Sequence, residues 1–300
     1  MTPKKTQAQD RPTYLSPIYR YINKFAGRKK EKKEIKALLQ QPHAMLVLKG
    51  IGGIGKTSIA FKIMQESEHL YQYIIWTNCD YPLDSDTDIL RNKLLYDNEQ
   101  LHRSLGIIEQ VRETNNEKEK WNILIQSLAQ LQGEVLWVID NAQAKDNKLI
   151  RELPYNCHIL ITSRHELKGI TTYNLDILSE KDALKIFKQY CKKTTDNHII
   201  EKINKAAGYH TLSIELLAKL LASLDTMTAS EFYEKLQQNL LNDTTRQVVF
   251  THYVKDEIDV RGIIMFAFRL GNLYHEKDIH PLLHTFCLLY TSPSPRDIGE

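Results

Sequence analysis

The stretch Gly50-Ile51-Gly52-Gly53-Ile54-Gly55-Lys56-Thr57 decides the fold of this 300-residue chain. It matches the pattern G-x-x-x-x-G-K-[ST], follows the apolar run 45–48 and leads into the helix-like segment 58–64. A strand, a glycine-rich loop and a helix in this order form the phosphate-binding loop, or P-loop, of nucleotide-binding proteins. The alternative, an incidental glycine-rich turn with a lysine, does not account for that context. We therefore expect the chain to bind a nucleoside diphosphate or triphosphate.

Each residue type in the P-loop has a chemical task. Glycines let the backbone wrap tightly, so that successive N–H groups and the start of the following helix point at phosphate oxygens. Lys56 supplies a positive charge near the β- and γ-phosphates, and the Thr57 hydroxyl is suited to ligate Mg²⁺. The expected nucleotide-binding residues of this loop are Gly50, Gly52, Gly53, Ile54, Gly55, Lys56, Thr57 and Ser58.

Composition and charge exclude several classes of protein. The chain is 42% hydrophobic and 26% charged, which is ordinary for a globular protein, and its length leaves room for about two domains. No apolar run approaches the roughly 20 residues of a membrane span, and the first ten residues are polar, unlike a secretory signal. A net charge of +3 gives no indication of nucleic-acid binding. The four scattered cysteines have no metal-ligand spacing, so we expect free thiols in a cytoplasmic protein.

Short apolar runs alternate with helical patterns up to about residue 176. The runs 73–77, 135–139 and 158–162 are typical of strands buried on both faces. Between the first two lies a long helical region, with Trp121, Leu124 and Leu128 at helical spacing. This alternation predicts an α/β fold in which helices cover both faces of a parallel sheet.

The pattern becomes almost entirely helical after residue 178. Helices are expected at 179–190, 199–207, 212–224 and 228–241, and two of them open with the capping patterns Ser-x-x-Asp and Thr-x-x-Glu. We divide the chain into an N-terminal extension at 1–21, a P-loop domain at 22–177, a helical lid at 178–245, the start of a winged-helix-like domain at 246–286 and a tail at 287–300.

Two further polar residues follow buried strands. Asp140 ends the run 135–139, where a P-loop ATPase holds Mg²⁺, although a turn or helix-capping role is an open alternative for an isolated Asp. Arg164 follows the run 158–162, and a guanidinium at that sheet edge can contact a γ-phosphate. Thr57 and Asp140 are the expected metal residues, and Lys56, Asp140, Asn141 and Arg164 the expected catalytic ones.

Six motifs in order resemble the NB-ARC ATPase module of the STAND class, especially its bacterial members. They are Phe25-Ala26-Gly27-Arg28, the P-loop, Val138-Ile139-Asp140-Asn141-Ala142, Leu160-Ile161-Thr162-Ser163-Arg164, the segment 178–187 and Gly208-Tyr209-His210-Thr211-Leu212 with the following 213–217.

The resemblance implies roles for several residues. Gly27 and Arg28 are expected near the adenine of bound ADP or ATP, Arg164 as the sensor of the γ-phosphate, and His210 and Thr211 at the start of the lid that closes over the nucleotide. Members of this class are switches in cell death, immunity, antiphage defence and transcriptional control. They rest with ADP and form homo-oligomers after exchange for ATP.

Two departures from the family pattern are visible. Many members carry two consecutive acidic residues where this chain has Asp140-Asn141, and an amide cannot accept a proton from water, so slow hydrolysis is expected. Tyr209-His210-Thr211 replaces the usual Gly-x-Pro of the lid. His210 as a nucleotide ligand and His210 as a lid or core histidine are both open.

The C-terminal stretch 287–297 resembles the translation of a transposase-type sequencing adaptor, with a native Ser/Pro-rich linker as the alternative. We expect residues after Phe286 to have no functional role, and the effector and sensor regions of such proteins to lie outside the given sequence. The leading hypothesis is an adenine-nucleotide switch in defence or signalling. A steadily hydrolysing P-loop ATPase or kinase and a STAND-type transcription regulator are the alternatives.

Overall fold

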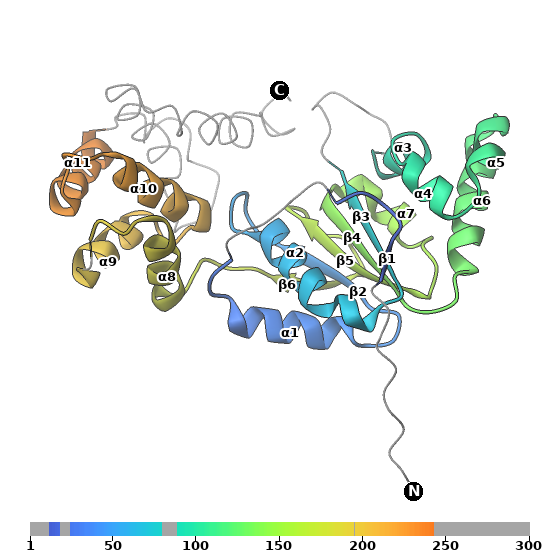
Figure 1. The fold of residues 1–300 in the computed structure, drawn as a ribbon, viewed down its shortest axis with the longest axis horizontal. Coiled ribbons are helices and arrows are strands. Elements are labelled where there is room, and N and C mark those ends of the chain that lie inside the picture. Colours follow the sequence, from blue (N-terminus) through green and yellow to red (C-terminus); the bar gives the residue numbers. More distant parts are fainter. Residues whose placement is uncertain (1–11, 19–24, 80–88, 195, 243–300) are drawn as a thin grey trace, which may run out of the picture. The chain divides into compact units, whose positions relative to one another are not determined.

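The computed structural model describes residues 12–18, 25–79, 89–194 and 196–242 (Figure 1). These residues fall into two compact units. The sheet unit contains residues 12–18, Lys29–Gly50 and Lys56–Leu175, and the helical unit contains residues 25–28, Ile51–Gly55 and 176–242.

The sheet unit is built from six strands and seven α-helices within the described residues. Its strands are β1 (Thr13–Tyr14), β2 (Met45–Lys49), β3 (Tyr73–Asn78), β4 (Val135–Ala142), β5 (Cys157–Ser163) and β6 (Thr171–Asn174). Its helices are α1 (Lys29–Leu39), α2 (Lys56–Ser67), α3 (Ile89–Leu95), α4 (Glu99–Ser104), α5 (Ile108–Glu113), α6 (Glu117–Ala129) and α7 (Asn147–Ile150), with short 3-10 turns at Glu68–Leu70 and Ala144–Asp146.

All strand pairings in the described residues are parallel, and the strand order is β1-β3-β4-β5-β2-β6. The strand that leads into the P-loop, β2, lies next to β5, and β5 lies next to β4. Because the strands run the same way, the ends of β2, β4 and β5 meet at one edge of the sheet. Polar residues that follow these strands are therefore brought together.

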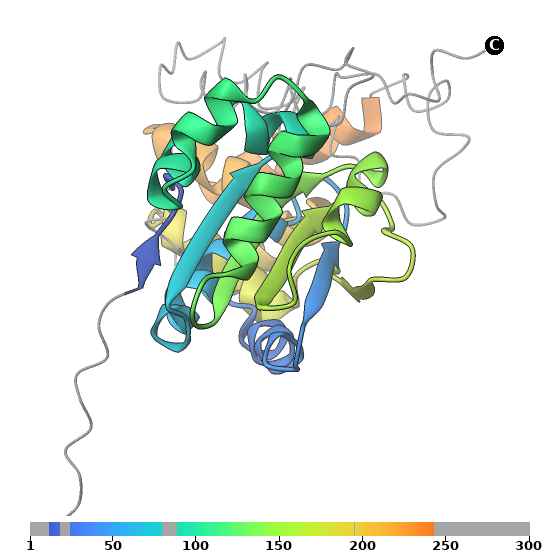
Figure 2. The same cartoon turned by 90° about the vertical axis from the view of Figure 1, so that its right-hand side faces the viewer.

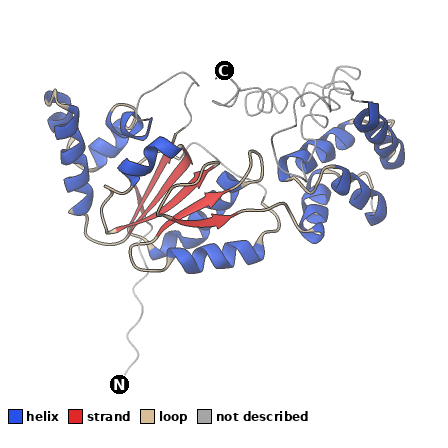
Figure 3. Cartoon of the chain, turned by 180° about the vertical axis from the view of Figure 1, so that it is seen from behind, coloured by secondary structure: helices blue, strands red, loops and turns tan. Residues whose placement is uncertain are grey.

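Alternating side chains of the central strands serve two apolar layers. One layer contains Val47, Ile139 and Ile161 and packs against Leu90 and other residues from α3 to α6. Figure 2 shows α6 lying across this side of the strands. On the opposite face Trp76 contacts Phe61 of α2 in an edge-on ring pair. Side chains on both faces of β2, β4 and β5 are buried, which explains the unbroken apolar runs. Helices lie on either side of the sheet (Figure 3).

The helical unit consists of α8 (Glu180–Tyr190), α9 (Asn197–Ala206), α10 (Thr211–Ser223) and α11 (Ala229–Asn242), together with two short segments from earlier in the chain. Phe187, Ile203, Leu217 and Phe232 are fully buried at its centre. Two of the helices begin at their predicted caps: Ser179 accepts from the N–H of Asp182, and Thr228 accepts from the N–H of Glu231.

The expected α/β P-loop fold with helices on the sheet is confirmed, and four strands and the four later helices lie where the sequence predicts them. The long helical region predicted before β4 contains the four helices α3, α4, α5 and α6. The strands β1 and β6 were not expected, because they are short, partly exposed and without an apolar run. Of the predicted extension 1–21, residues 13 and 14 form β1, while 1–11 and 19–21 lie outside the described residues. The last three residues of the predicted lid, the winged-helix-like segment and the tail also lie outside them.

Candidate phosphate-binding site

Lys56 is the first residue of α2, and its side chain is almost fully buried. Its ammonium donates a 2.8 Å hydrogen bond to the carbonyl oxygen of Gly50, at the start of the same loop. Burial and the positive charge of Arg164 lower the pKa of Lys56 to about 8, while Asp140 opposes this shift. The group is therefore still mainly protonated at neutral pH, as a phosphate partner must be.

Thr57 and Thr162 both donate to the same carboxylate oxygen of Asp140. The Thr57 hydroxyl lies 2.7 Å and the Thr162 hydroxyl 2.6 Å from Asp140 Oδ1, and Asp140 is 1% exposed. A buried carboxylate is costly without such donors. The two hydroxyls stabilise its ionised form and fix its orientation beside the start of α2.

The chain makes a bulge directly after this carboxylate. Between Ile139 and Ala142, strand β4 has one residue more than β5 opposite it, and Asn141 adopts a φ of 60°. Asparagine tolerates this left-handed conformation better than most residues. The backbone N–H of Asn141 donates to the Thr162 hydroxyl at 2.9 Å, so Thr162 holds both the carboxylate and the bulge.

The groups around Asp140 suit Mg²⁺, which takes hard oxygen ligands and is often bound by one carboxylate together with substrate phosphates. Thr57 and Asp140 are the residues that would hold this ion, and the ion would neutralise phosphate charge. Arg164 follows β5 at the same edge and is exposed to solvent. The sheet unit therefore brings Lys56, Thr57, Asp140, Asn141 and Arg164 to one edge of the sheet.

The middle of the P-loop, Ile51–Gly55, belongs to the helical unit. Gly53 and Gly55 have φ values of 71° and 101°, which are open to glycine and strained for other residues. Carbonyl groups of this segment accept hydrogen bonds from the start of α10: Leu212 N–H donates to Gly53, and the Thr211 hydroxyl donates to Ile54 at 2.8 Å.

Gly27 and Arg28 lie against α8 in the same unit. Both have positive φ, and the Arg28 N–H donates to the Asp182 carboxylate at 2.8 Å. A Cβ on Gly27 would lie 2.7 Å from Asp182 Cβ, so only glycine fits. The buried Arg28 guanidinium donates to the Ile54 carbonyl at 3.2 Å. Arg28 therefore contacts the P-loop backbone.

Both ring nitrogens of His210 have protein partners. Nε2 lies 2.8 Å from the Gly52 carbonyl oxygen, and Nδ1 lies 2.9 Å from the Ser213 hydroxyl. The side chain is 0% exposed and caps α10. This arrangement favours the alternative in which His210 is a lid residue rather than a nucleotide ligand.

Sequence reasoning did not assign functional positions to Thr162 and Asp182, although it quoted the motifs that contain them. One sequence feature could have identified Thr162, because it is a hydroxyl residue near the end of an otherwise apolar strand. Asp182 reads in the sequence as an ordinary first-turn residue of a helix. Its contact with Arg28 joins positions 154 apart in the chain, and no local pattern reveals such a pair.

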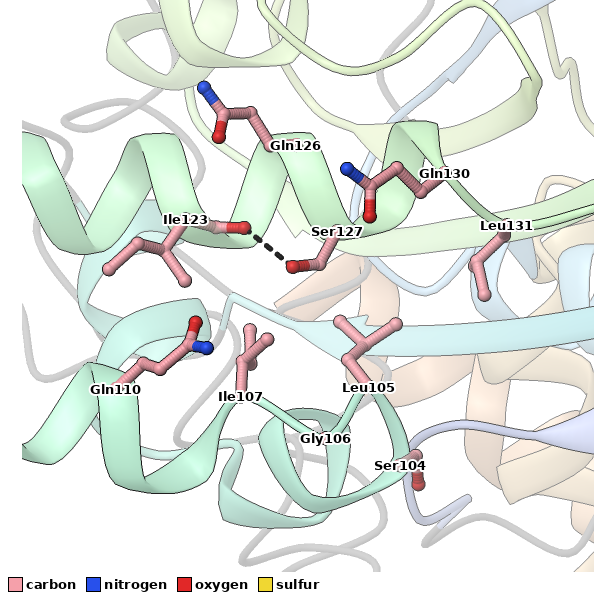
Figure 4. A pocket seen from close by; sticks show the side chains of 10 residues that line it. All are labelled: Ser104, Leu105, Gly106, Ile107, Gln110, Ile123, Gln126, Ser127, Gln130 and Leu131. Atoms are coloured by element: carbon pink, nitrogen blue, oxygen red, sulfur yellow. Dashed lines mark hydrogen bonds between the residues drawn. The ribbon is translucent and has the colours of Figure 1, made fainter.

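A groove of about 480 Å³ lies elsewhere on the sheet unit, between α6 and the turn that joins α4 to α5 (Figure 4). Its lining includes Gln110, Gln126, Gln130 and aliphatic side chains, and no lining residue is charged. The Ser127 hydroxyl is already bonded to the Ile123 carbonyl oxygen. Without a cation, this groove lacks the chemistry of a phosphate site.

Among the described residues, none of the helices has the length and apolar character that a membrane span requires.

Two curated proteins show sequence similarity to the chain. It is 25% identical over 197 residues to the transcription activator GutR of Bacillus subtilis, covering 58% of this chain and 23% of GutR. It is 24% identical over 255 residues to an uncharacterized WD repeat-containing protein of Nostoc sp., covering 72% of this chain and 19% of that protein. The chain therefore spans less than a quarter of the length of either relative.

Solved structures with a similar course of the chain include a Walker-type ATPase of Pyrococcus abyssi, with 12% identity, a TM-score of 0.49 and coverage of 91% of this chain and 86% of that one. The ORC1 protein of Aeropyrum pernix in complex with DNA has 11% identity, a TM-score of 0.45 and coverage of 89% and 85%.

The NB-ARC domain matches residues 28–197, which is more than half of the chain. That range contains the whole P-loop, Asp140 and Arg164, and it ends within the helical unit. The protein belongs to the NB-ARC domain family and is a nucleotide-binding P-loop protein.

Proposed function

We propose that this chain is an adenine-nucleotide switch that binds ADP or ATP with Mg²⁺ and hydrolyses ATP slowly. Lys56 and the N–H groups of the loop take the phosphates, and Thr57 and Asp140 hold the metal ion. Arg164 contacts the γ-phosphate, so that ATP and ADP are bound differently. The Thr57 to Asp140 hydrogen bond supports this proposal, because it orients both oxygen groups toward the start of α2.

The proposal of slow ATP hydrolysis rests on one observation: the residue after Asp140 is an amide held in a bulge. A carboxylate at position 141 would be able to accept a proton from an attacking water, whereas Asn141 can only orient it. Asp140 itself already accepts two hydroxyl donors on Oδ1, which stabilises its ionised form. Positioning and charge neutralisation then remain as the sources of catalysis.

Slow turnover suits a switch, because the bound nucleotide must persist long enough to set a conformation. We infer that exchange of ADP for ATP favours homo-oligomers, in bacterial defence or signal transduction within the cytoplasm. The same proposal divides the chain into domains, with the P-loop domain ending at residue 177 and a winged-helix-like domain beginning within 246–286. Effector and sensor regions are expected in the remainder of a longer protein.

A transcription regulator is the second candidate. It is favoured by the similarity to GutR, whose name describes a transcription activator. The same nucleotide switch would then control a DNA-binding region outside the segment shared with this chain.

Calorimetric titration of the full chain tests the binding part of the proposal. Wild type is expected to bind ADP and ATP in the presence of Mg²⁺, and Lys56→Ala to lose most of the affinity, because a charge-assisted contact to phosphate is removed. Lys62→Ala is the matched control, since Lys62 lies on the same helix with its ammonium 3.9 Å from Glu66. Equal affinity of wild type and Lys56→Ala contradicts the proposal.

A further inference from the structure

Three consecutive carbonyl groups of the P-loop accept hydrogen bonds from three consecutive residues at the start of α10. His210 Nε2 lies 2.8 Å from the Gly52 oxygen, the Leu212 N–H lies 3.1 Å from the Gly53 oxygen, and the Thr211 hydroxyl lies 2.8 Å from the Ile54 oxygen. All of these residues belong to the helical unit.

The partners of His210 fix its tautomer. A carbonyl oxygen only accepts, so Nε2 must carry the proton that is donated to Gly52. Nδ1 then accepts from the backbone N–H of Ser213 at 3.4 Å and, as the N-cap, closes the first turn of α10. A single buried ring therefore joins the P-loop to the end of a helix.

Holding these carbonyls also determines where the loop N–H groups point. The peptide unit is planar and trans, so the C=O of one residue and the N–H of the next point in opposite directions. Bonds to the oxygens of Gly52, Gly53 and Ile54 thus orient the N–H groups of Gly53, Ile54 and Gly55. Such N–H groups are what a P-loop offers to phosphate.

The approach of α10 to the loop is close enough to require glycine. A Cβ on Gly53 would lie 2.9 Å from His210 Cε1 and 2.9 Å from Leu212 Cδ2. Position 53 has therefore no space for a side chain on the side that faces α10. The contact is a packed one, and it does not depend on long flexible side chains.

We propose that His210 and Thr211 are positioning residues that hold the P-loop from its carbonyl side, ready to bind phosphate, and that neither recognises adenine. The proposal rests on nucleotide binding by the P-loop. It assigns the first turn of α10 a task that acts on the phosphate-binding loop, in place of the direct nucleotide contact that the sequence left open for His210.

Hydrogen–deuterium exchange of the full chain without nucleotide tests directly whether His210 and Thr211 order the P-loop. In His210→Asn the shorter amide retains the capping acceptor for Ser213 and loses the donor to Gly52. Amides of 52–57 are expected to exchange about tenfold faster, the effect of one hydrogen bond, while those of α10 stay at the wild-type rate. Thr211→Val is expected to act likewise and Thr211→Ser to restore protection. His198→Asn, at an exposed histidine of α9, is the matched control.

Affinity for a ligand without a base separates the two roles. Dissociation constants are measured for Mg²⁺-ADP and for Mg²⁺ with inorganic tripolyphosphate, and in His210→Asn both are expected to rise by the same factor. A rise for ADP alone makes His210 an adenine ligand and overturns the proposal, as does unchanged loop exchange in both His210→Asn and Thr211→Val. If wild type binds neither ligand, the proposed function fails. The exchange experiment still shows whether His210 and Thr211 order the P-loop.

Discussion

The Thr57 hydroxyl donates to Asp140 Oδ1 at 2.7 Å across 83 positions of sequence. Thr57 is the second residue of α2, which follows β2, and Asp140 lies in β4, which is separated from β2 by β5. The strand between them supplies Thr162, whose hydroxyl donates to the same oxygen. The parallel order β4-β5-β2 thus explains how three distant residues form one network.

Thr162→Val is expected to lower the free energy of unfolding by about 1–3 kcal/mol, because it leaves a buried carboxylate and the Asn141 N–H with one partner fewer. Thr162→Ser keeps the hydroxyl and loses one methyl group, so a smaller loss of about 1 kcal/mol is expected. Chemical denaturation measures both. If the two variants are equally stable, Thr162 does not act through its hydroxyl.

Arg164→Ala is expected to weaken ATP binding about tenfold and to leave ADP binding unchanged, since the side chain is assigned to the γ-phosphate alone. The residue is exposed, so the fold is expected to tolerate the change. Arg164→Lys retains the charge but lacks the planar guanidinium, so its ATP affinity is expected to lie between those of wild type and Arg164→Ala. Titration with both nucleotides measures this difference, and an equal loss for ADP and ATP removes the sensor role.

Asp182→Asn is expected to destabilise the protein at neutral pH and to have little effect in acid. Burial alone raises the pKa of Asp182, but the hydrogen bonds from Lys185 and the Arg28 N–H outweigh it and lower the pKa below its usual value. A lowered carboxylate pKa gives stability that is present above the unfolded value near 3.8 and is lost as the pH falls through the folded value.

Urea denaturation of wild type and Asp182→Asn from pH 7 down to pH 3 checks this dependence. The difference in stability between the two is expected to shrink as the pH falls below about 4. A difference that stays constant over this range assigns the effect to packing against Gly27 rather than to charge.

The P-loop, the four apolar strands and the later helices were predictable because their signals are local. A buried strand in a parallel sheet is apolar throughout, as in Val135–Ile139, and the caps of α8 and α11 use short-range hydrogen bonds such as Thr228 with Glu231. Asp140 follows the apolar run of β4, so its position at the sheet edge follows from the sheet order.

The contacts of the helical unit were not predictable from local patterns. His210 and Gly52 are 158 positions apart, and Arg28 and Asp182 are 154 apart. The sequence left His210 open between a ligand and a core residue, because a histidine at the predicted start of the lid has the chemistry for either. The strands β1 and β6 were missed because edge strands such as Thr171–Asn174 carry few apolar residues.

Steady-state phosphate release by the full chain, with the oligomeric state recorded in the same samples, tests the switch most directly. The account predicts turnover well below about 1 per second for wild type, and a faster rate for Asn141→Asp, which supplies a proton acceptor in a conformation that Asp also tolerates. Rapid turnover by a wild-type monomer without any activator contradicts the account and favours a steadily hydrolysing enzyme.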